Sequence, residues 1–367
     1  MRCPVKEWTD QFNSFNSLKG LLFRPWMEAI LSGDFLPPVE ASIDPIYDCN
    51  LDCVWCSSCH ILEDPALRGS KMTRDHLLKL CRFLGHWGVK GACFAGGGEP
   101  FLHENVSEAV EVLWEMGVQS AFLTNGTVIR DKDIDTMIAR SRWVGCSVDA
   151  AGRETYGALK RTSPGNFDRA MDFLREVCAR KKAAGSRLEV SFKYLLFPEN
   201  VEELYDGALL AKKTGVDYIH IRPVAWENIH GGCNEPLKFD LDLVNRLLEK
   251  TFQLEDDNFR VYGIRHKFSP ALNLRRGFSR CRAAPLLVNL GADGGVYLCV
   301  DHQGCQAFRI GSHHPDPWQI LDFWGGNRHR QMMEQVDLCR CPRCTFGVYN
   351  EIMEKVLIQD RMCRVFP

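Results

Sequence analysis

The chain has 367 residues, enough for one large domain and a second, smaller one. Its 45 Lys and Arg residues nearly balance its 47 Asp and Glu residues, so the net charge is −2 and no basic tract predicts nucleic-acid binding. No apolar run reaches the length of about 18 residues that a membrane span needs, and the N-terminus is not a signal peptide. We therefore expect a cytoplasmic protein that does not bind membranes.

Apolar runs of strand length alternate with helical patterns over the first two thirds of the chain. The runs lie at 41–47, 91–95, 120–123, 143–148, 188–196 and 218–222, and the helical patterns lie near 72–88, 105–116, 131–140, 165–182 and 200–214. Successive strand-then-helix units predict parallel strands with right-handed crossovers. Six units are too few to close an eight-stranded barrel, so we expect an α/β fold built on a partial (β/α)6 TIM-like barrel.

The remaining segments have a different character. Residues 1–40 contain a short amphipathic stretch that ends before Pro37-Pro38, and we interpret them as a lead segment. We place the barrel core at 41–225, a connecting segment with a polar helix near 241–254 at 226–270, and a small Cys-rich domain at 271–367. In this last domain, Asp293-Gly294 between two apolar runs predicts a β-hairpin.

The chain contains 17 cysteines, which is unusual for a large protein in a reducing compartment. Thiolate ligands for metals explain such a number better than disulfides do. Two groups of cysteines stand out, one at 49–59 and one at 281–344. We interpret the scattered ones as small buried hydrophobic residues, namely Cys81, Cys93, Cys146, Cys178 and Cys233.

The first group follows the first predicted strand directly and spaces Cys49, Cys53 and Cys56 as C-x3-C-x2-C. A structural zinc site usually takes four ligands in two C-x2-C pairs, so three close thiolates favour a [4Fe-4S] cluster with one iron that has no protein ligand. Cys59 offers a fourth thiolate, which would close the cluster and make it an electron carrier. The spacing alone leaves both alternatives open.

This cysteine pattern, together with Trp55 and the segment FAGGGEP after the second strand, resembles the radical S-adenosylmethionine (SAM) superfamily. The resemblance implies that the open iron binds SAM and that an electron cleaves SAM into methionine and a 5′-deoxyadenosyl radical. It also implies that Trp55 lies near the adenine of SAM. The methionine amino group would be contacted by Gly97, Gly98 and Glu99.

Polar residues after the later strands extend this predicted SAM site. Asn125, Ser147 and Asp149 stand where relatives contact the ribose or the carboxylate of SAM, although Asp149 also fits a helix N-cap. Lys193 and Arg222 lie on the fifth and sixth strands. Each suits a SAM carboxylate or a substrate anion, and equally a structural salt bridge. The sequence does not identify a catalytic acid or base.

The second group contains Cys281, Cys299, Cys341 and Cys344. Four thiolates suit either a structural zinc site or a fully ligated [4Fe-4S] cluster. The pattern resembles the SPASM extensions of radical SAM enzymes and, because the next cysteine is only Cys363, their shortened twitch form. We therefore expect one auxiliary [4Fe-4S] cluster. The alternative ligands are Cys339, Cys305 and Cys363, and we interpret three nearby histidines as surface residues, namely His302, His313 and His314.

The spacing of the second group is most similar to that of twitch-bearing aminocyclitol dehydrogenases. The resemblance implies a radical SAM oxidoreductase or lyase that abstracts hydrogen from a small polar substrate, such as a sugar, aminocyclitol or nucleoside, in natural-product biosynthesis. An external one-electron reductant such as flavodoxin or ferredoxin would supply electrons.

Two alternatives remain open. The first is a radical SAM maturase that modifies a ribosomal peptide or a protein side chain; such enzymes usually carry a leader-binding domain before the barrel, for which residues 1–40 are too short. The second is a non-catalytic iron–sulfur or zinc protein, for which the GGGEP segment would have no use.

Overall fold

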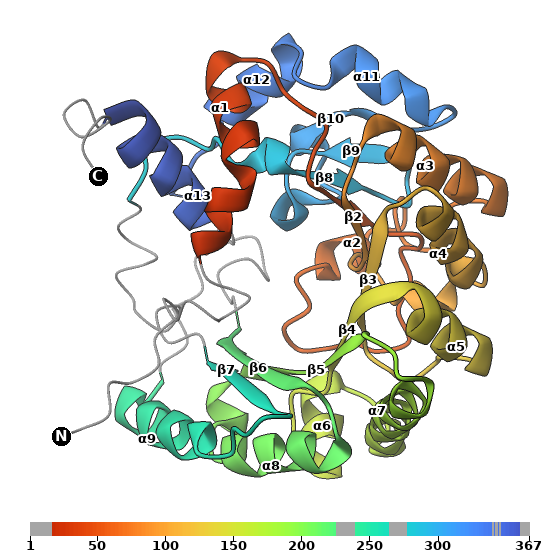
Figure 1. Cartoon of the computed structure of the whole chain (residues 1–367), viewed down its shortest axis with the longest axis vertical. Helices are drawn as coiled ribbons and strands as arrows, with labels where there is room; N and C mark the ends of the chain where they lie inside the picture. Colours follow the sequence, from red (N-terminus) through yellow and green to blue (C-terminus); the bar gives the residue numbers. More distant parts are fainter. Residues whose placement is uncertain are drawn as a thin grey trace.

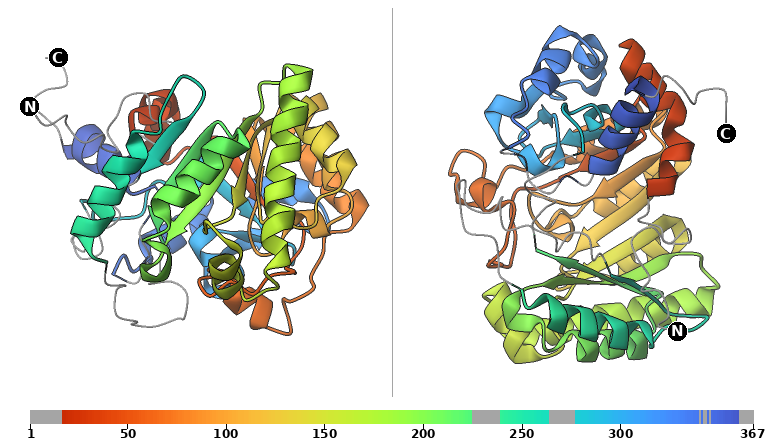
Figure 2. Two further views of the ribbon diagram at one scale, coloured as in Figure 1. Left: turned by 90° about the horizontal axis from the view of Figure 1, so that it is seen from below. Right: turned by 90° about the vertical axis from the view of Figure 1, so that its left-hand side faces the viewer.

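The computed structural model describes residues 17–224, 239–263, 277–339, 341, 344 and 346–359. In these residues one curved ten-stranded sheet has the order β10-β9-β8-β1-β2-β3-β4-β5-β6-β7. Helices cover the outer side of the curve, as Figures 1 and 2 show. The strands and helices thus form the α/β partial barrel that the sequence predicts.

The six predicted strands lie side by side and are all parallel. They are β1 (Glu40–Ile43), β2 (Gly91–Phe94), β3 (Gln119–Thr124), β4 (Ser141–Ser147), β5 (Glu189–Leu196) and β6 (Tyr218–Pro223). The first strand ends four residues before the predicted limit, because Pro45 has no N–H for the sheet ladder.

The predicted helices are confirmed with small shifts of their ends. They are α3 (Arg74–Trp87), α4 (Val106–Glu115), α5 (Asp131–Arg140), α7 (Gly165–Ala184), α8 (Leu204–Thr214) and, in the connecting segment, α9 (Leu241–Phe252). A further helix, α6 (Arg153–Lys160), was not predicted. It is short and follows β4 at the end of the sheet where the cysteines of the first group lie.

Helix α3 illustrates how the helices pack on the sheet. The side chain of Thr73 accepts a hydrogen bond from the backbone N–H of His76 and so caps the first turn. Leu77, Leu80 and Leu84, spaced three and four residues apart, are completely buried in the core between helices and sheet. The same core contains Cys81 and Cys146, and Cys93 is buried as well. Cys178 is half-buried, and Cys233 lies outside the described residues.

The sheet continues beyond the six predicted strands at both edges. At one edge β7 (Arg260–Gly263) pairs parallel with β6, and at the other β8 (Leu287–Leu290) pairs parallel with β1. The predicted hairpin joins β8 to β9 (Gly295–Tyr297), and β10 (Arg309–Ser312) extends it. The sheet therefore runs across the limits that we set at residues 225 and 270, and the division into domains stays a prediction.

The two ends of the described chain pack against each other. The segment η1 (Ser17–Phe23) leads into α1 (Arg24–Ser32), whose Met27 and Ile30 are buried against Leu286 and Met353. Met353 belongs to the C-terminal helical segment formed by α13 (Gly347–Glu351) and the π-helical turn η10 (Ile352–Gln359). Figure 1 shows α1 beside α13. The other C-terminal helices are α11 (Ile320–Phe323) and α12 (Asn327–Glu334).

Among the described residues, no helix combines the length and the apolar composition that crossing a bilayer requires.

Candidate functional site

The first cysteine group lies on a tight loop after the carboxyl end of β1. The backbone N–H of Cys56 donates to the carbonyl of Cys53, and that of Cys59, the first residue of α2 (Cys59–Glu63), donates to the carbonyl of Cys56. Burial raises the pKa of Cys49 to about 12 and that of Cys56 to about 11, and the neighbouring thiols add to both shifts. Thiolates here therefore require a cationic partner, which iron ions provide.

Helix α6 supports this loop through its last two residues. The N–H of Val54 donates to the carbonyl of Leu159 (3.0 Å) and the N–H of Asp52 to that of Lys160 (3.3 Å). The Lys160 side chain is fully buried, forms an ion pair with Asp149 and places Nζ 4.7 Å from the centre of the Trp55 ring. Burial raises the pKa of Cys53, and the positive charge of Lys160 opposes that rise.

The sequence prediction missed Lys160. Tyr156 and Lys160 are four residues apart in α6 and share one face of the helix. Because Tyr156 is completely buried, the lysine on the same face is buried as well. A sequence analysis that recognised α6 could therefore have predicted a buried lysine directly behind the cysteine loop.

Gly97 and Gly98 have a packing role that the structure makes plain. A Cβ atom at Gly97 would lie 2.4 Å from the ring of Tyr47, and one at Gly98 would lie 2.2 Å from the carbonyl oxygen of Asp48. Only glycine lets the loop after β2 approach the residues before Cys49 so closely. The sequence suggested a close approach to a ligand, and the described approach is to the cysteine loop. Contact with SAM stays a prediction for both glycines.

Glu99 links the loop after β2 to the end of β3. Its buried carboxylate accepts hydrogen bonds from Thr124 Oγ1 (2.7 Å), the N–H of Asn125 (2.7 Å) and the N–H of Phe101 (3.2 Å). Burial raises the pKa of Glu99 to about 7, although these hydrogen bonds oppose the rise. The Asn125 amide donates to Asn50 Oδ1 at 2.9 Å and lies 4.0 Å from Cys49 Sγ. The structure thus brings Glu99 and Asn125 next to the first cysteine.

Asp149 is part of the scaffold of this site. One carboxylate oxygen pairs with Lys160, and the other accepts from the N–H of Leu195 at 2.6 Å. Its backbone is left-handed, with φ of +61°, a conformation that is uncommon for non-glycine residues but that aspartate adopts more readily than most. The N-cap interpretation was wrong, because Gly152 occupies the N-cap of α6.

Lys193 and Arg222 bring positive charge to the concave side of β5 and β6, away from the helices. Lys193 lies beside Ser147 in the strand register, and its Nζ is 3.1 Å from His220 Nδ1. Burial, followed by the charge of Arg222, lowers the pKa of Lys193 to about 7. The Arg222 side chain is exposed on this side. Ser147, Lys193 and Arg222 therefore lie together at the barrel mouth, where SAM or a substrate anion would bind.

The second cysteine group surrounds a single cavity. Cys281, Cys299, Cys341 and Cys344 all line it, together with apolar side chains such as Phe278. Burial raises the pKa of Cys344 to about 12 and also raises the pKa of Cys281 and Cys299. The structure thus brings together the four cysteines that the sequence grouped.

Two of the alternative ligands, Cys339 and Cys305, do not line this cavity, and Cys339 is exposed. Cys363 lies outside the described residues. In the described part of the chain, no three His, Cys, Asp or Glu side chains converge closely enough to hold one metal ion. Four thiols that line one cavity suit a structural zinc site or a fully ligated [4Fe-4S] cluster, and the auxiliary cluster stays a prediction.

The prediction of three surface histidines was wrong for two of them. His302 is half-buried, lines the cavity and places Nε2 3.7 Å from Cys341 Sγ. His313 is completely buried, and its Nδ1 accepts a hydrogen bond from His76 Nε2 at 2.8 Å. His314 is exposed, as predicted. Contacts between distant segments bury the first two, and the local sequence carries no signal of such contacts.

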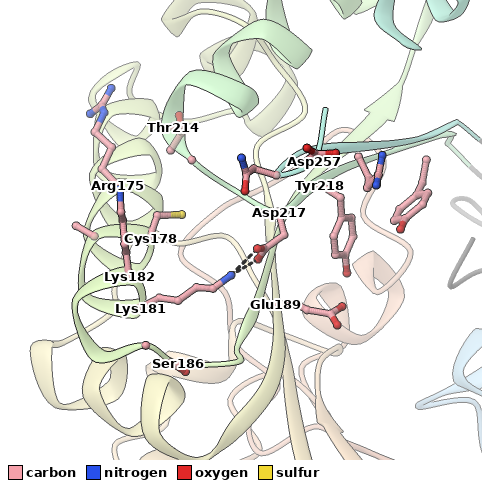
Figure 3. A pocket seen from close by; sticks show the side chains of 16 residues that line it. Arg175, Cys178, Lys181, Lys182, Ser186, Glu189, Thr214, Asp217, Tyr218 and Asp257 are labelled. Atoms are coloured by element: carbon pink, nitrogen blue, oxygen red, sulfur yellow. Dashed lines mark hydrogen bonds and ion pairs between the residues drawn. The ribbon is translucent and has the colours of Figure 1, made fainter. Parts of the chain in front are cut away.

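A wide pocket lies at the other end of the barrel, at the amino ends of β5, β6 and β7 (Figure 3). An ion pair between Lys181 and Asp217 lies on its wall, and Asp217 also accepts from the N–H of Val190. None of the predicted site residues lines this pocket. Ligands of parallel barrels bind at the carboxyl ends of the strands, so we place the site at the cysteine loop.

Comparison with known proteins agrees with this location. The family model of the radical SAM superfamily matches residues 43–211, from the end of β1 into α8, and so includes the first cysteine group. The crystal structure of Streptococcus suis SuiB bound to precursor peptide SuiA has a TM-score of 0.63 at 17% identity, covering 96% of this chain and 80% of SuiB. At that identity the likeness establishes a common fold.

Two curated relatives are similar in sequence. Mycofactocin maturase MftC of Mycobacterium tuberculosis is 25% identical over 271 residues, which are 71% of this chain and 64% of MftC. A probable GTP 3′,8-cyclase of Methanothermobacter marburgensis is 29% identical over 126 residues, which are 34% of this chain and 40% of the cyclase. The chain spans less than two thirds of either relative.

Proposed function

We propose that this chain is a radical SAM enzyme that modifies a peptide, and the match of the superfamily model to residues 43–211 supports the first part of this proposal. The cofactors of this family fit the residues present. Three thiols on one tight loop suit a [4Fe-4S] cluster with an open iron, and the four thiols around the C-terminal cavity suit an auxiliary [4Fe-4S] cluster.

In this proposal Cys49, Cys53 and Cys56 hold the first cluster, and Cys59 remains an alternative fourth ligand. When bound with SAM, this cluster supplies the electron that cleaves SAM into methionine and a hydrogen-abstracting 5′-deoxyadenosyl radical. Lys160 stabilises the loop through its backbone carbonyl and offsets part of the thiolate charge at Cys53. Thiolates close to a buried cation are easier to form and keep.

The remaining polar residues orient SAM and substrate. Glu99 and Asn125, fixed by hydrogen bonds beside Cys49, present oxygen acceptors and an amide to the methionine end of SAM. Trp55 packs on Phe197 with ring centres 4.5 Å apart, and its proposed place near the adenine rests on its position in the cysteine motif. Ser147 supplies a hydroxyl, and Arg222 supplies a positive charge for a carboxylate of SAM or of the substrate. Lys193, whose pKa is about 7, adds a second positive charge when it is protonated. The proposed role of Asp149 is indirect, through Lys160.

The alignment with MftC is the observation that favours a peptide substrate. It covers 271 residues and therefore extends well beyond the segment 43–211 that defines the superfamily. The peptide-bound SuiB structure has the same fold over 96% of this chain. These comparisons support the peptide alternative better than the small polar substrate that the sequence favoured.

A small-molecule substrate is the second candidate. The alignment with the probable GTP 3′,8-cyclase supports it, but this alignment covers 34% of the chain, against 71% for MftC. The oxidoreductase or lyase type of the net reaction, an external reductant such as flavodoxin or ferredoxin, and a cytoplasmic location all stay predictions.

Co-expression with short peptides encoded beside the gene of this chain tests the proposal. Mass spectrometry should detect a changed mass for one peptide with the unaltered enzyme and an unchanged mass with the Cys53→Ala variant. If no peptide changes, and deuterium instead passes from a sugar or nucleoside into 5′-deoxyadenosine, the small-molecule candidate replaces the peptide.

A further inference from the structure

Among the described residues, one histidine lines the cavity of the second cysteine group besides its four cysteines. His302 ends the short turn η7 (Val300–His302), and its Nε2 lies 3.7 Å from Cys341 Sγ. This distance is long for a nitrogen and an oxygen, but it is within reach of a hydrogen bond to the larger sulfur atom. None of the roles assigned so far includes this histidine.

Contacts on both sides fix the position of His302. Its backbone N–H donates to the carbonyl of Cys299 at 3.1 Å, and its carbonyl accepts from the N–H of Cys305 at 3.2 Å. Its ring stacks on Phe308, with centres 3.8 Å apart and planes at 10°. The imidazole is therefore held in one orientation, with Nε2 toward Cys341.

The same turn is tied to the first cysteine group. His60 follows Cys59 in α2, and its Nε2 lies 2.8 Å from the carbonyl oxygen of Gln303, the neighbour of His302. Since a carbonyl oxygen only accepts, His60 is the donor and carries its proton on Nε2. The loop of the first cysteine group thus supports the position of the imidazole at the second.

We propose that His302 donates its Nε2–H to the thiolate of Cys341 and so raises the reduction potential of the auxiliary cluster. Reduction adds one electron to the cluster, and an N–H directed at a ligand sulfur stabilises the added negative charge. His302 is thus a positioning residue that tunes the auxiliary cluster. This inference rests on the proposed function, because it requires Cys341 to hold a cluster.

A second residue in the cavity, Asp301, should lower the reduction potential of the auxiliary cluster. Asp301 Oδ2 lies 3.7 Å from Cys299 Sγ, so its negative charge disfavours an added electron. His302 and Asp301 are consecutive residues that face two different cysteines of the group. Substitutions at the two positions should therefore shift the potential in opposite directions.

The test uses the full-length protein with Cys49, Cys53 and Cys56 replaced by alanine, so that the auxiliary cluster alone gives an electron paramagnetic resonance signal. A dithionite titration measures the ratio of reduced to oxidised cluster at a fixed potential. His302→Phe should lower the ratio of reduced to oxidised cluster about threefold to tenfold. A tenfold change corresponds to about 59 mV for one electron. His302→Gln keeps an N–H donor and should give a ratio close to that of the parent protein. Asp301→Asn should raise the ratio above that of the parent protein. His314→Phe, at an exposed position, is the matched control and should leave it unchanged.

Three results would overturn the inference. The first is an unchanged ratio in His302→Phe at full iron content. The second is a loss of iron in His302→Phe and His302→Gln alike, which would make His302 a ligand. The third is an absence of iron in the parent protein itself, and this would also refute the auxiliary cluster of the proposed function. Iron analysis of the parent separates this third result from the first two.

Discussion

The two cysteine groups of this chain are assembled in different ways. The three cysteines of the first group lie within eight residues on one loop, whereas those of the second are spread from Cys281 to Cys344. Closing a short loop costs little chain entropy, and bringing distant segments together costs more. The first site is therefore shaped by the barrel scaffold around it, while the second depends on the folding of the C-terminal region.

The surroundings of the two groups differ as well. Behind the first lies a buried cation, Lys160, which is paired with Asp149. The second has Asp301 and His302 against its sulfur atoms. The difference between the two groups indicates that the surroundings of the first site stabilise thiolates on a short loop. In the second, we expect metal binding and folding to be coupled.

Loss of a ligand from the first group should have the largest effect on activity. Cys53→Ala should abolish reductive cleavage of SAM, because only two of the three loop thiolates remain for the cluster. The auxiliary cluster should stay bound, so the iron content should fall by about half. Liquid chromatography of 5′-deoxyadenosine and iron analysis measure both effects. Continued formation of 5′-deoxyadenosine by this variant would show that the first cluster has been assigned to the wrong residues.

Loss of a ligand from the second group should have the largest effect on stability. Cys344→Ala should lower the unfolding temperature of the reconstituted protein, because several kcal/mol of metal-binding energy contribute to folding there. Cys339→Ala is the matched control, since Cys339 is exposed and lies in the same segment. Equal unfolding temperatures for the two variants, at equal iron content, would remove Cys344 from the ligand set.

Substitution of the buried cation Lys160 measures how much the scaffold of the first site contributes to stability when no metal is bound. Lys160→Met should lower the free energy of unfolding of the metal-free protein by about 3–5 kcal/mol, because Asp149 is left buried without its partner. Lys355→Met breaks an exposed ion pair with Glu351 and should cost less than about 1 kcal/mol. Urea unfolding measures both. Similar losses in the two variants would mean that the pair of Lys160 and Asp149 does not support the loop.

The smallest predicted effect is a pH dependence from Glu99. Its pKa is about 7 in the folded protein, against an ordinary value of 4.5 for glutamate, so between these values the folded protein keeps a proton that the unfolded chain has lost. The contribution of Glu99 to stability is therefore greatest below pH 4.5 and falls by roughly 3 kcal/mol as the pH rises to 7. The Glu99→Gln variant should lack this loss of stability. Urea unfolding of the metal-free variant and the metal-free wild type at about pH 5 and about pH 8 measures the difference. An identical pH dependence in both proteins would contradict the assignment.

Much of the fold and both cysteine groups were predictable because their signals are local. Alternating strand and helix patterns indicated the six central strands, and the spacing of cysteines indicated the two groups that the structure brings together. The pairing of β8 with β1 was not predictable, since strands almost 250 residues apart carry no local mark of their partnership.

The residues whose surroundings the sequence did not predict share one property. Lys160, His302 and His313 acquire their environment from segments that are distant in the chain or from a helix that was not predicted. Asp149 was recognised as a polar residue at the end of β4. Its partner Lys160 was not recognised, because the burial of an ion pair depends on tertiary packing, and the spacing of residues in the sequence does not report tertiary packing.

The account depends most directly on the presence of two clusters of different kinds in one chain. Anaerobic reconstitution followed by iron and zinc analysis, with an assay of 5′-deoxyadenosine after addition of SAM and dithionite, tests this claim. We predict about eight irons per chain, as two [4Fe-4S] clusters contain, and release of 5′-deoxyadenosine. Zinc without iron, or iron without any cleavage of SAM, would contradict the account.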